Sequence, residues 1–508
     1  MHPDVDDELE VLVVGAGPAG ATLACDLLRR GIRVRIIDAA EGGYPGSRAK
    51  GLQPRTLEVL DDLGVLDDVL ARAERYPKLG LHLGPVTVPK TMIRLHEPSD
   101  DVPYPDTLLI AQYDTDACLR RRIDALGGSV EFSTRLESFE QDTDGVVATL
   151  AGPDGTTTVR TRYLVGADGA SSTVRKQAGI DFVGSTDDSD RMILADVVVD
   201  GLSRDRWHMW PRRAGRFTGL RPLPGGDRFQ LMIRLRPDED PALDLASLDR
   251  RVHDVTGLHV REVHWTSVWR PNVRLAARYR ERNVFLAGDA AHVHTPAGAQ
   301  GLNTGVQDAY NLGWKLGQVL AGAPDGLLDT YDAERRPIAA RVLGLSSEIY
   351  RDITGNKLAA VKRGDEERQL TLSYRGGPLA PDEGGADGVR PGDRAPDASF
   401  TDADGRTRRL FDAFRGPHFT LLAVGDAAIA GLGAVGWPDR GAPLETVAIA
   451  GPADGPPDSS RWYDIGSPAW ILVRPDGYVA QVAPVDAHEP AAALARSLRD
   501  MAPEPGAR

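Results

Sequence analysis

The 508-residue chain has little cysteine, no excess of positive charge and no long apolar run, and each shortage excludes a class of protein. Its two cysteines, Cys25 and Cys118, fall inside expected helices, which favours small buried side chains over a disulfide. His292 and His294 have no third ligand at zinc-site spacing, so we expect no metal. The formal net charge of -14 argues against a nucleic-acid partner. Because no apolar run is long enough to cross a membrane and the N-terminus is acidic, we expect a cytoplasmic protein with no membrane partner.

Glycine is plentiful, at 55 residues, and the first glycine cluster organises the chain. Residues 15–20, with the sequence GAGPAG, follow an apolar run and precede an apolar helical pattern. A second apolar run ends on Asp38, which completes the spacing of a βαβ dinucleotide-binding unit. Gly15 allows the tight turn, Gly17 lets the backbone approach a diphosphate, and Gly20 lets helix and strand pack closely. The helix dipole would attract the diphosphate. The Asp38 carboxylate would bind a ribose 2′-hydroxyl and repel a 2′-phosphate, which favours FAD or NAD over NADP at this site.

Two later apolar runs end in the same way, on an acidic residue beside a glycine. Asp168 and Gly169 follow the first run and precede a helix start, and Gly288 and Asp289 follow the second. A helical pattern from Asn303 onward begins after a glycine-rich loop and would offer N–H groups to an anionic or electron-rich group. Each site could bring a cofactor to the strand ends, although the first could equally be an ordinary strand–helix turn.

The remaining sequence divides by composition. Residues 186–274 alternate apolar and polar positions between Pro-Gly turns, which predicts an antiparallel sheet with one face free to roof a pocket. Residues 76–104 alternate similarly and are assigned to the same region. A stretch rich in proline and glycine, 376–394, marks a linker, and 395–508 is predicted to be a small α/β domain. That domain contains no cysteine, which excludes a redox role for it.

Three spaced motifs together resemble a known family. They are GAGPAG with Asp38, the GADG sequence at 166–169 with Arg175, and the GDAAH sequence at 288–292 with Pro296 and the helix that follows. They resemble the single-component FAD-dependent aromatic hydroxylases related to para-hydroxybenzoate hydroxylase and phenol hydroxylase. The C-terminal part resembles the thioredoxin-like extension, lacking redox cysteines, of phenol hydroxylase-like enzymes and of hydroxylases of aromatic polyketide biosynthesis, and the polyketide branch is the more similar.

The resemblance implies an α/β fold built from three parts. A Rossmann-like FAD-binding domain is interrupted by an antiparallel-sheet substrate domain and followed by a thioredoxin-like α/β domain. The implied boundaries are 1–75, 105–185 and 275–375 for the FAD-binding domain, 76–104 and 186–274 for the substrate domain, 376–394 for the linker, and 395–508 for the thioredoxin-like domain.

The resemblance also assigns residues to FAD. Arg48 and Gln112 would contact its diphosphate or ribityl region, Asp289 its ribityl chain, and Pro296 its isoalloxazine ring, whose pyrimidine edge would face N–H groups at 301–303. Asp116 stands where relatives often carry Glu, which changes the reach of the carboxylate but not its charge. The implied cofactor-binding residues are Gly15, Gly17, Ala19, Gly20, Asp38, Arg48, Gln112, Asp168, Gly169, Arg175, Gly288, Asp289, Pro296, Gly301, Leu302 and Asn303, of which Pro296, Gly301, Leu302 and Asn303 position the flavin and Asp168, Gly169 and Arg175 also serve the pyridine nucleotide.

The implied activity is an NAD(P)H-consuming monooxygenase that hydroxylates an electron-rich aromatic substrate, such as a polycyclic polyketide. NAD(P)H reduces tightly but non-covalently bound FAD, and O2 then forms a C4a-hydroperoxide whose distal oxygen goes to the ring. NADPH is favoured over NADH by resemblance, and the protein would be a monomer or a homodimer. Baeyer–Villiger insertion into a polyketide ketone is an alternative, as are a flavin oxidase and a non-catalytic flavin-binding protein. No catalytic acid or base stands out, and the candidate pocket residues are Tyr104, Trp207, His208, Trp210, Arg216, Arg221 and Phe229.

Overall fold

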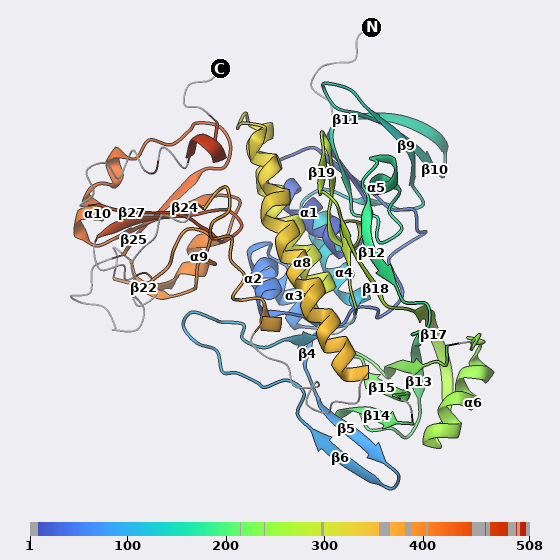
Figure 1. Ribbon diagram of the computed structural model, residues 1–508. Helices are drawn as coiled ribbons and strands as arrows, with labels where there is room; N and C mark the ends of the chain where they lie inside the picture. The colour runs from blue at the N-terminus through green and yellow to red at the C-terminus, as the bar shows by residue number, and fades with distance from the viewer. Residues whose placement is uncertain are drawn as a thin grey trace.

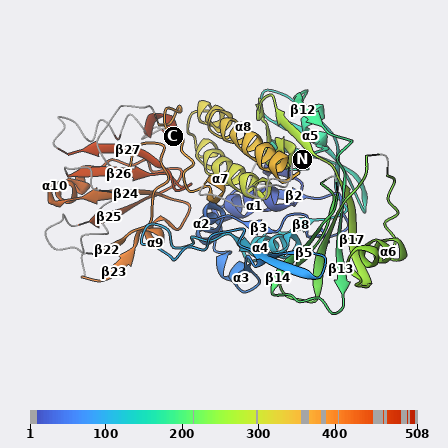
Figure 2. The same cartoon turned by 60° about the horizontal axis from the view of Figure 1, so that its bottom comes forward.

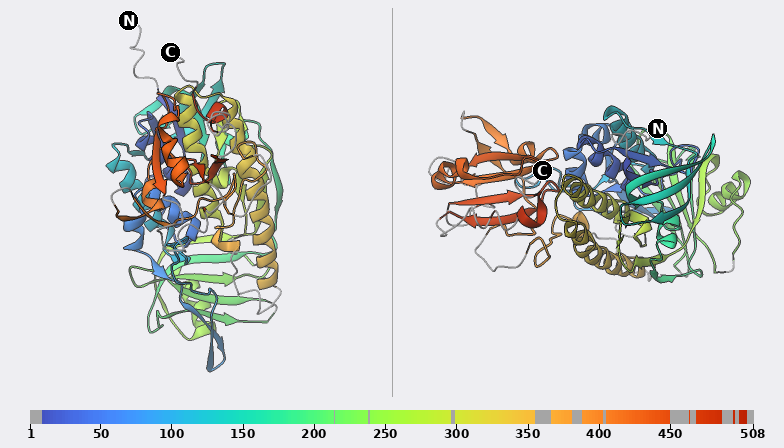
Figure 3. Two further views of the ribbon diagram at one scale, coloured as in Figure 1. Left: turned by 90° about the vertical axis from the view of Figure 1, so that its left-hand side faces the viewer. Right: turned by 90° about the horizontal axis from the view of Figure 1, so that it is seen from above.

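The computed structural model has three layers, visible in Figure 1. A C-terminal sheet, in orange and red, lies on one side of the long helices α7 (Gly301–Leu320) and α8 (Gly326–Thr354). A large antiparallel sheet lies at the other end of the molecule with α6 (Leu245–Thr256). Turned views keep α7 and α8 between the two (Figure 2, Figure 3). The structure describes residues 9–213, 215–237, 239–295, 299–354, 366–380, 388–402, 405–449, 463, 468–485, 494 and 498–503.

The sheet that carries the glycine-rich turn has parallel strands at its centre. β1 (Leu9–Val14) lies between β2 (Val34–Ile37) and β11 (Gly155–Gly166), and β20 (Val284–Leu286) pairs in parallel with β11. Residues 11–14 are buried, as expected of a strand covered on both faces. The helix predicted after the turn is present as α1 (Pro18–Arg29) and packs beside α7. The full order is β19-β20-β11-β1-β2-β8, and the hairpin strands β9 and β10 extend β11.

Shorter elements surround this sheet. The sequence predicts a helix after residue 108 with Asp114 or Thr115 as its N-cap. The helix instead begins at Gln112, and its N-cap is Ala111. The described helices are α2 (Pro54–Asp62), α3 (Leu66–Leu70), α4 (Gln112–Ala125), α5 (Thr173–Gln177), and the 3-10 helices η2 (Gly288–Ala290) and η5 (Glu366–Arg368). The further strands are β3 (Gly51–Leu52), β4 (Glu74–Arg75), β7 (Leu108–Leu109), β8 (Val130–Glu131), β9 (Arg135–Gln141), β10 (Val146–Gly152), β12 (Phe182–Thr186), β18 (Asn272–Ala276), β19 (Arg280–Glu281) and β21 (His292–Val293).

A seven-stranded sheet in the order β17-β13-β16-β15-β14-β5-β6 contains the strands expected within 186–274 and two from residues 78–90. Side chains on successive residues point to opposite faces of this sheet. Ile193 and Leu231 pack against Leu248 of α6, whereas Met192 and Met232 lie on the other face. The strands are β5 (Lys78–Leu83), β6 (Val86–Lys90), β13 (Met192–Val199), β14 (Arg206–Pro211), β15 (Phe217–Pro222), β16 (Arg228–Arg234) and β17 (Val260–Trp269).

The C-terminal sheet has the order β25-β24-β26-β27, with β24 and β25 parallel and the other pairs antiparallel. The sequence predicts strands at 419–424, 445–450, 469–474 and 478–482, and the four strands lie at these positions. The sequence also predicts a terminal helix near residues 491–499, most of which lie outside the described residues. The elements are β22 (Ser399–Thr401), β23 (Thr407–Arg409), α9 (Leu410–Phe414), β24 (Phe419–Val424), α10 (Asp426–Ala430), η6 (Leu432–Ala434), β25 (Leu444–Ile449), β26 (Ala469–Val473) and β27 (Val479–Pro484).

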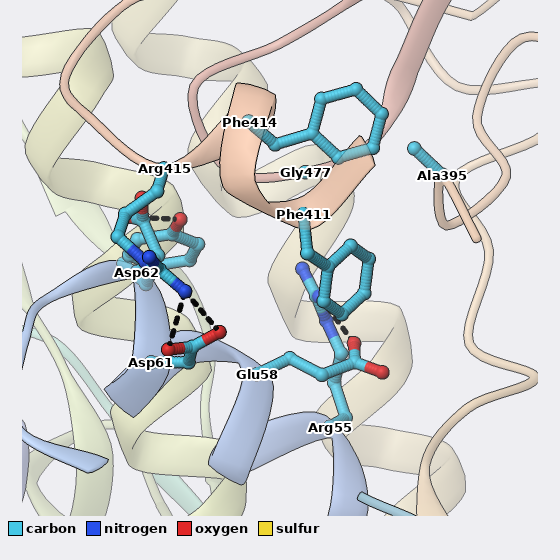
Figure 4. Close-up of a pocket in the computed structure, with 10 residues that line it drawn as sticks. Arg55, Glu58, Asp61, Asp62, Ala395, Phe411, Phe414, Arg415 and Gly477 are labelled. Carbon is cyan, nitrogen blue, oxygen red and sulfur yellow. Dashed lines mark hydrogen bonds and ion pairs between the residues drawn. The ribbon is translucent and has the colours of Figure 1, made fainter. Parts of the chain in front are cut away.

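The C-terminal part packs against α2 through polar contacts (Figure 4). Arg415, just after α9, donates to the carboxylate of Asp61 at 2.9 Å, and the N–H of Gly416 donates to Asp62 at 2.7 Å. The cavity between α2 and α9 has a volume of about 30 Å³. Since one water needs roughly 10–15 Å³ of such volume, the cavity has room for water but not for a polycyclic substrate.

A buried charge cluster joins the C-terminal part to α7 and α8. The carboxylate of Glu334 lies 2.6 Å from Arg474 and 2.8 Å from Lys315, and Arg474 also pairs with Asp476. None of the four side chains is more than 1% exposed. Because the opposite charges compensate one another inside the interface, loss of one partner would leave a buried charge unpaired. Within the described ranges, no helix is long and apolar enough to cross a membrane.

Candidate functional site

The three glycine-acid motifs meet at one edge of the first sheet. The last residues of their strands are in register, since Val14 pairs with Gly166 and Gly166 pairs with Leu286. Hydrogen bonds continue beyond the strands, because the Ala167 N–H donates to the Val14 carbonyl at 2.8 Å and the Ala287 N–H donates to the Gly166 carbonyl at 3.0 Å. Segments more than a hundred residues apart in the sequence are therefore held together at the carboxyl ends of parallel strands, where open α/β sheets bind ligands.

Two of the glycines in the first turn are required by close packing. A Cβ on Gly15, which has φ +104, would lie 2.4 Å from the Ala167 carbonyl oxygen. A Cβ on Gly20 would lie 1.9 Å from the Gly15 carbonyl oxygen. These contacts match the predicted roles of Gly15 in the tight turn and Gly20 in the close approach of helix and strand.

Gly17 has a different environment. It is the N-cap of α1 with an ordinary extended backbone, φ -70 and ψ -177, and a Cβ at this position would have no atom within 4 Å. The protein's own packing therefore does not require glycine here. The N–H groups of the first helical turn, at Ala19 and Gly20, have no partner inside the helix and mark its positive end. Open space at such a position fits the close approach of a diphosphate.

Asp38 stabilises the same turn. One oxygen of its carboxylate accepts from the Ala16 N–H at 2.8 Å, and the other accepts from the Ala40 N–H at 2.9 Å. The side chain is partly exposed. A carboxylate has about four lone-pair sites, so Asp38 can still accept from a ribose hydroxyl.

Arg48, Gln112 and Asp289 come together from three separate segments. Arg48 Nη2 lies 3.9 Å from Asp289 Oδ2, and both side chains are substantially exposed, at 53% and 41%. Gln112, the first residue of α4, accepts from the Ala49 N–H through Oε1 at 3.2 Å. Because the long Arg48–Asp289 contact is weak and open to solvent, both groups can turn toward a bound molecule.

Asp116, one turn further along α4, is a buried carboxyl group. It is 1% exposed, and its Oδ1 has no hydrogen-bond partner in the structure. Burial raises its pKa to about 7. The sequence analysis noted this position only because Asp stands where relatives often carry the longer Glu. Burial of the carboxyl group could not be predicted, since it depends on how α4 packs.

Asp168 and Arg175 stabilise the strand–helix turn with their side chains. The Asp168 carboxylate accepts from Ser172 Oγ at 2.5 Å and from the Thr173 N–H at 2.7 Å, and Ser172 itself is the N-cap of α5. Arg175 donates to the carbonyl of Ala290 at 2.9 Å, which ties this turn to the motif at 288–292. Gly169 has φ +76, which favours glycine. Contact of these residues with a nucleotide stays a prediction.

The start of α7 is held by Asn303. Its Oδ1 accepts from the Gln53 N–H at 2.8 Å and its Nδ2 donates to the Gly51 carbonyl at 2.8 Å. The side chain thus fastens residues 51–53 to the helix, while the N–H groups at Gly301 and Leu302 belong to the unsatisfied first turn. Pro296, predicted to lie against the flavin, falls outside the described residues.

A buried acid that the sequence analysis did not single out binds residues of the motif at 288–292. Asp308 of α7 accepts from His292 Nε2 at 2.6 Å, from Arg335 at 2.8 Å and from the Gly288 N–H at 3.3 Å. His292 is therefore hydrogen-bonded to a carboxylate that also pairs with Arg335. The described residues hold no group of three or more metal-binding side chains.

His294 leaves one nitrogen without a partner beside the start of α7. Its Nδ1 lies 2.7 Å from the Thr295 carbonyl and donates to it, so Nε2 carries a lone pair. Nε2 is buried and unpaired, and a Cβ on Gly301 would lie 2.9 Å from it. Burial lowers the pKa of this imidazole and keeps it neutral. A buried acceptor next to free N–H groups fits a polar molecule that offers both a donor and an acceptor.

Two cations flank one tryptophan on the side of the large sheet that faces residues 43–51. The Arg221 guanidinium carbon lies 4.2 Å from a ring centroid of Trp207, and Lys50 Nζ lies 5.9 Å from a ring centroid of the same side chain. Lys50 also hydrogen bonds to Gln230 of β16. Asp196 on the same face accepts from the Ser47 N–H at 2.8 Å. These contacts place Trp207 and Arg221 against the loop that leads to Arg48.

The other predicted pocket residues lie elsewhere. Trp210 and Phe229 pack on the α6 face of the sheet, and His208 stacks with Trp210 and His82 on that face. Strand alternation explains this, because His208 directly follows Trp207. Arg216 lines a separate cavity beside α6. The Tyr104 hydroxyl donates to Asp61 at 3.1 Å, close to the C-terminal part.

Comparison with known proteins gives matches along almost the whole chain. A family model described as "FAD binding domain" matches residues 8–346, and one described as "Aromatic-ring hydroxylase, C-terminal" matches residues 389–505. A flavin-dependent monooxygenase of Mycobacteroides abscessus is 40% identical over 483 residues, which cover 93% of this chain and 96% of that protein. The 6-methylpretetramide 4-monooxygenase of Streptomyces rimosus is 35% identical over 523 residues, which cover 94% and 91%. The crystal structure of a ternary complex of aklavinone-11 hydroxylase with FAD and aklavinone has a TM-score of 0.82 and 30% identity, covering 98% of this chain and 99% of that one.

Proposed function

The chain belongs to the FAD-dependent aromatic-ring hydroxylases, and from that premise we propose that its substrate is a polycyclic aromatic polyketide with a free phenol. It is a monooxygenase that uses FAD, NAD(P)H and O2. The substrate class is supported by relatives named for 6-methylpretetramide and aklavinone, which align over nearly the whole chain. The observation that supports FAD-dependent activity is the register of β1, β11 and β20, which brings all three cofactor motifs to one edge.

The residues at this edge fit FAD. Open space at Gly17 beside the N-terminus of α1 accommodates a diphosphate, and Asp38 has lone pairs left for a ribose. Arg48, Gln112 and Asp289 would hold the diphosphate and ribityl chain. When bound, FAD supplies electron transfer from NAD(P)H and the activation of O2 for insertion of one oxygen atom into an aromatic ring.

The start of α7 would bind the electron-accepting end of the cofactor. N–H groups at Gly301 and Leu302 would stabilise negative charge there, assisted by the helix dipole. His294 Nε2 would accept a hydrogen bond beside them, which satisfies a nitrogen that is otherwise buried without a partner. Asp308, His292 and Arg335 would act as positioning residues by holding α7 to the Gly288 turn.

Lys50 and Arg221 would act on the substrate. Both cations lie around Trp207, whose buried ring holds them in place beside the loop at 43–51. Two positive charges next to a bound phenol lower the pKa of its hydroxyl, and a phenolate ring is more electron-rich than the neutral phenol. Lys50 and Arg221 would thus hold the substrate as a phenolate against the face of the large sheet that faces residues 43–51.

The finer organisation belongs to the same proposal. Residues 1–75, 105–185 and 275–375 would form the FAD-binding domain, with the substrate sheet inserted and a thioredoxin-like domain at the C-terminus. NADPH would be the reductant, and the protein would act as a monomer or homodimer in the cytoplasm.

The proposal is tested by following NADPH oxidation by the purified yellow protein, with and without a panel of polycyclic phenols, together with H2O2 and product. Substrate-stimulated oxidation with one oxygen atom added to an aromatic carbon supports it. A new ester carbonyl in the product NMR spectrum indicates Baeyer–Villiger insertion, and H2O2 formed with substrate but without NADPH indicates an oxidase. A colourless protein that takes up no FAD refutes the assignment.

A further inference from the structure

A second cavity lies between α6 and the turn that joins β14 to β15. Its volume is about 620 Å³, within the range of small-molecule sites. It is bordered by Thr218 and Ile233, and the neighbouring Leu231 packs on α6. In Figure 1 α6 lies at the outer edge of the molecule, at the end opposite the C-terminal sheet.

The described lining of this cavity has an excess of arginine. Arg212, Arg216, Arg234, Arg236 and Arg251 converge on it from the turn, from the end of β16 and from α6. A concentration of positive charge is unexpected in a chain with a formal net charge of -14. The cavity would therefore attract anions that the rest of the surface repels.

Two of these arginines are neutralised within the protein. Arg234 Nε lies 2.9 Å from Asp190, and Arg251 forms an ion pair with Glu239. The guanidinium groups of Arg212 and Arg216 form no hydrogen bond or ion pair with any described residue. Beyond these pairs, the only other acid in the described lining is Asp254, so the positive charge exceeds the negative.

The fork of guanidinium N–H donors matches the oxygens of phosphate and carboxylate groups. A ribose phosphomonoester carries close to two negative charges at neutral pH and can accept from several arginines at once. Phe217, which also borders the cavity, offers an apolar surface for an adenine ring.

We propose that this cavity binds the ribose phosphomonoester of an adenine nucleotide. Two sources carry this chemistry: the 2′-phosphate of NADPH and the 3′-phosphate of a coenzyme A thioester. The inference goes beyond the proposed function, and only the NADPH source depends on it. Binding at this cavity would not use the sheet edge at Gly17, where Asp38 repels a 2′-phosphate.

The test measures binding directly by calorimetry on the FAD-loaded enzyme, so it does not depend on turnover. The probes are 2′,5′-ADP, 3′,5′-ADP, and adenosine as a ligand without phosphate. The variant is Arg212→Gln with Arg216→Gln, and each single variant is also measured in case the double variant is poorly folded. Arg213→Gln is the matched control, because Arg213 is exposed in the same turn but does not line the cavity.

We expect one of the two bisphosphates to bind and adenosine not to bind. The dissociation constant should rise at least about tenfold in the double variant, because two charge-assisted contacts to the phosphate are lost, and should stay unchanged in Arg213→Gln. Preference for 2′,5′-ADP, with a higher KM for NADPH but not for NADH in the double variant, identifies the reductant as the source. Preference for 3′,5′-ADP identifies the thioester. Absence of binding, or equal weakening by Arg213→Gln, overturns the proposal, whatever the outcome for hydroxylation.

Discussion

Gly17 and Gly20 offer the sharpest separation between cofactor binding and folding, because they lie three residues apart in one turn and their surroundings differ. A Cβ on Gly17 meets no protein atom within 4 Å, whereas a Cβ on Gly20 would lie 1.9 Å from the Gly15 carbonyl oxygen. If the space at Gly17 is kept open for a diphosphate, Gly17→Ala should fold normally and bind FAD poorly.

The expected magnitudes follow from these surroundings. Replacing an N-cap glycine by alanine costs up to about 1 kcal/mol. The reduced freedom of the unfolded chain offsets this by about 0.4–1 kcal/mol, so the free energy of unfolding of the apoprotein should change by no more than about 1 kcal/mol in either direction. Crowding a close-packed contact costs about 1–3 kcal/mol, which would weaken FAD binding roughly 5- to 150-fold. Gly20→Ala should instead lower the free energy of unfolding of the apoprotein by about 3 kcal/mol or more.

Both variants are examined as apoproteins by denaturant unfolding and then titrated with FAD by quenching of flavin fluorescence. The account expects Gly17→Ala to match the wild type in unfolding and to differ in the titration. If Gly17→Ala binds FAD as tightly as the wild type, the diphosphate does not approach this turn. If it unfolds as readily as Gly20→Ala, the turn has only a structural role.

Three further substitutions test other parts of the account. Although burial opposes it, Arg474 and Lys315 hold the pKa of Glu334 at about 2, so this carboxylate contributes stability above pH 4.5 that is lost as the pH falls toward 2. Glu334→Gln should lower the free energy of unfolding at pH 7 by about 3–5 kcal/mol in urea titrations, and a wild-type value would show that the interface tolerates unpaired charge. Burial raises the pKa of Asp116 to about 7, so the apoprotein loses stability as the pH rises from 4 through 7. Asp116→Asn should gain up to about 4 kcal/mol at pH 8 and almost nothing at pH 4, and a gain independent of pH would contradict the assignment. Arg221→Gln should weaken binding of a phenolic substrate about tenfold and raise the pKa of the bound phenol in spectrophotometric titrations, whereas an unchanged pKa would remove Arg221 from the pocket.

Local sequence patterns predicted the cofactor edge because each of its strands and turns is determined by residues that are close together in the sequence. The glycines of GAGPAG and the apolar runs before Asp168 and Gly288 each define a strand and a turn over about ten residues, and all three strands are present. The mixed α/β class is confirmed on the same grounds. Parallel strands then bring their ends together whatever lies between them in the sequence.

The side of the large sheet on which a residue lies could not be predicted in this way. Trp207 and His208 are neighbours in sequence, and only the register of β14 against β5 and β15 decides which of them faces the loop at 43–51. Because that register depends on strands from residues 78–90, pattern alone placed aromatic residues of both faces in one pocket. Asp308 was missed for a related reason, since its partners His292 and Arg335 lie 16 and 27 residues away.

The central claim is that one atom of O2 is inserted into an aromatic substrate at the expense of NAD(P)H. It is tested most directly by running the reaction under 18O2 with a polycyclic phenol and NADPH, and by measuring the label in the product. The account predicts one 18O atom on a ring carbon for each NADPH consumed in productive turnover. An oxygenated product that takes its oxygen from water, or labelled H2O2 with unlabelled substrate throughout the panel, would contradict it.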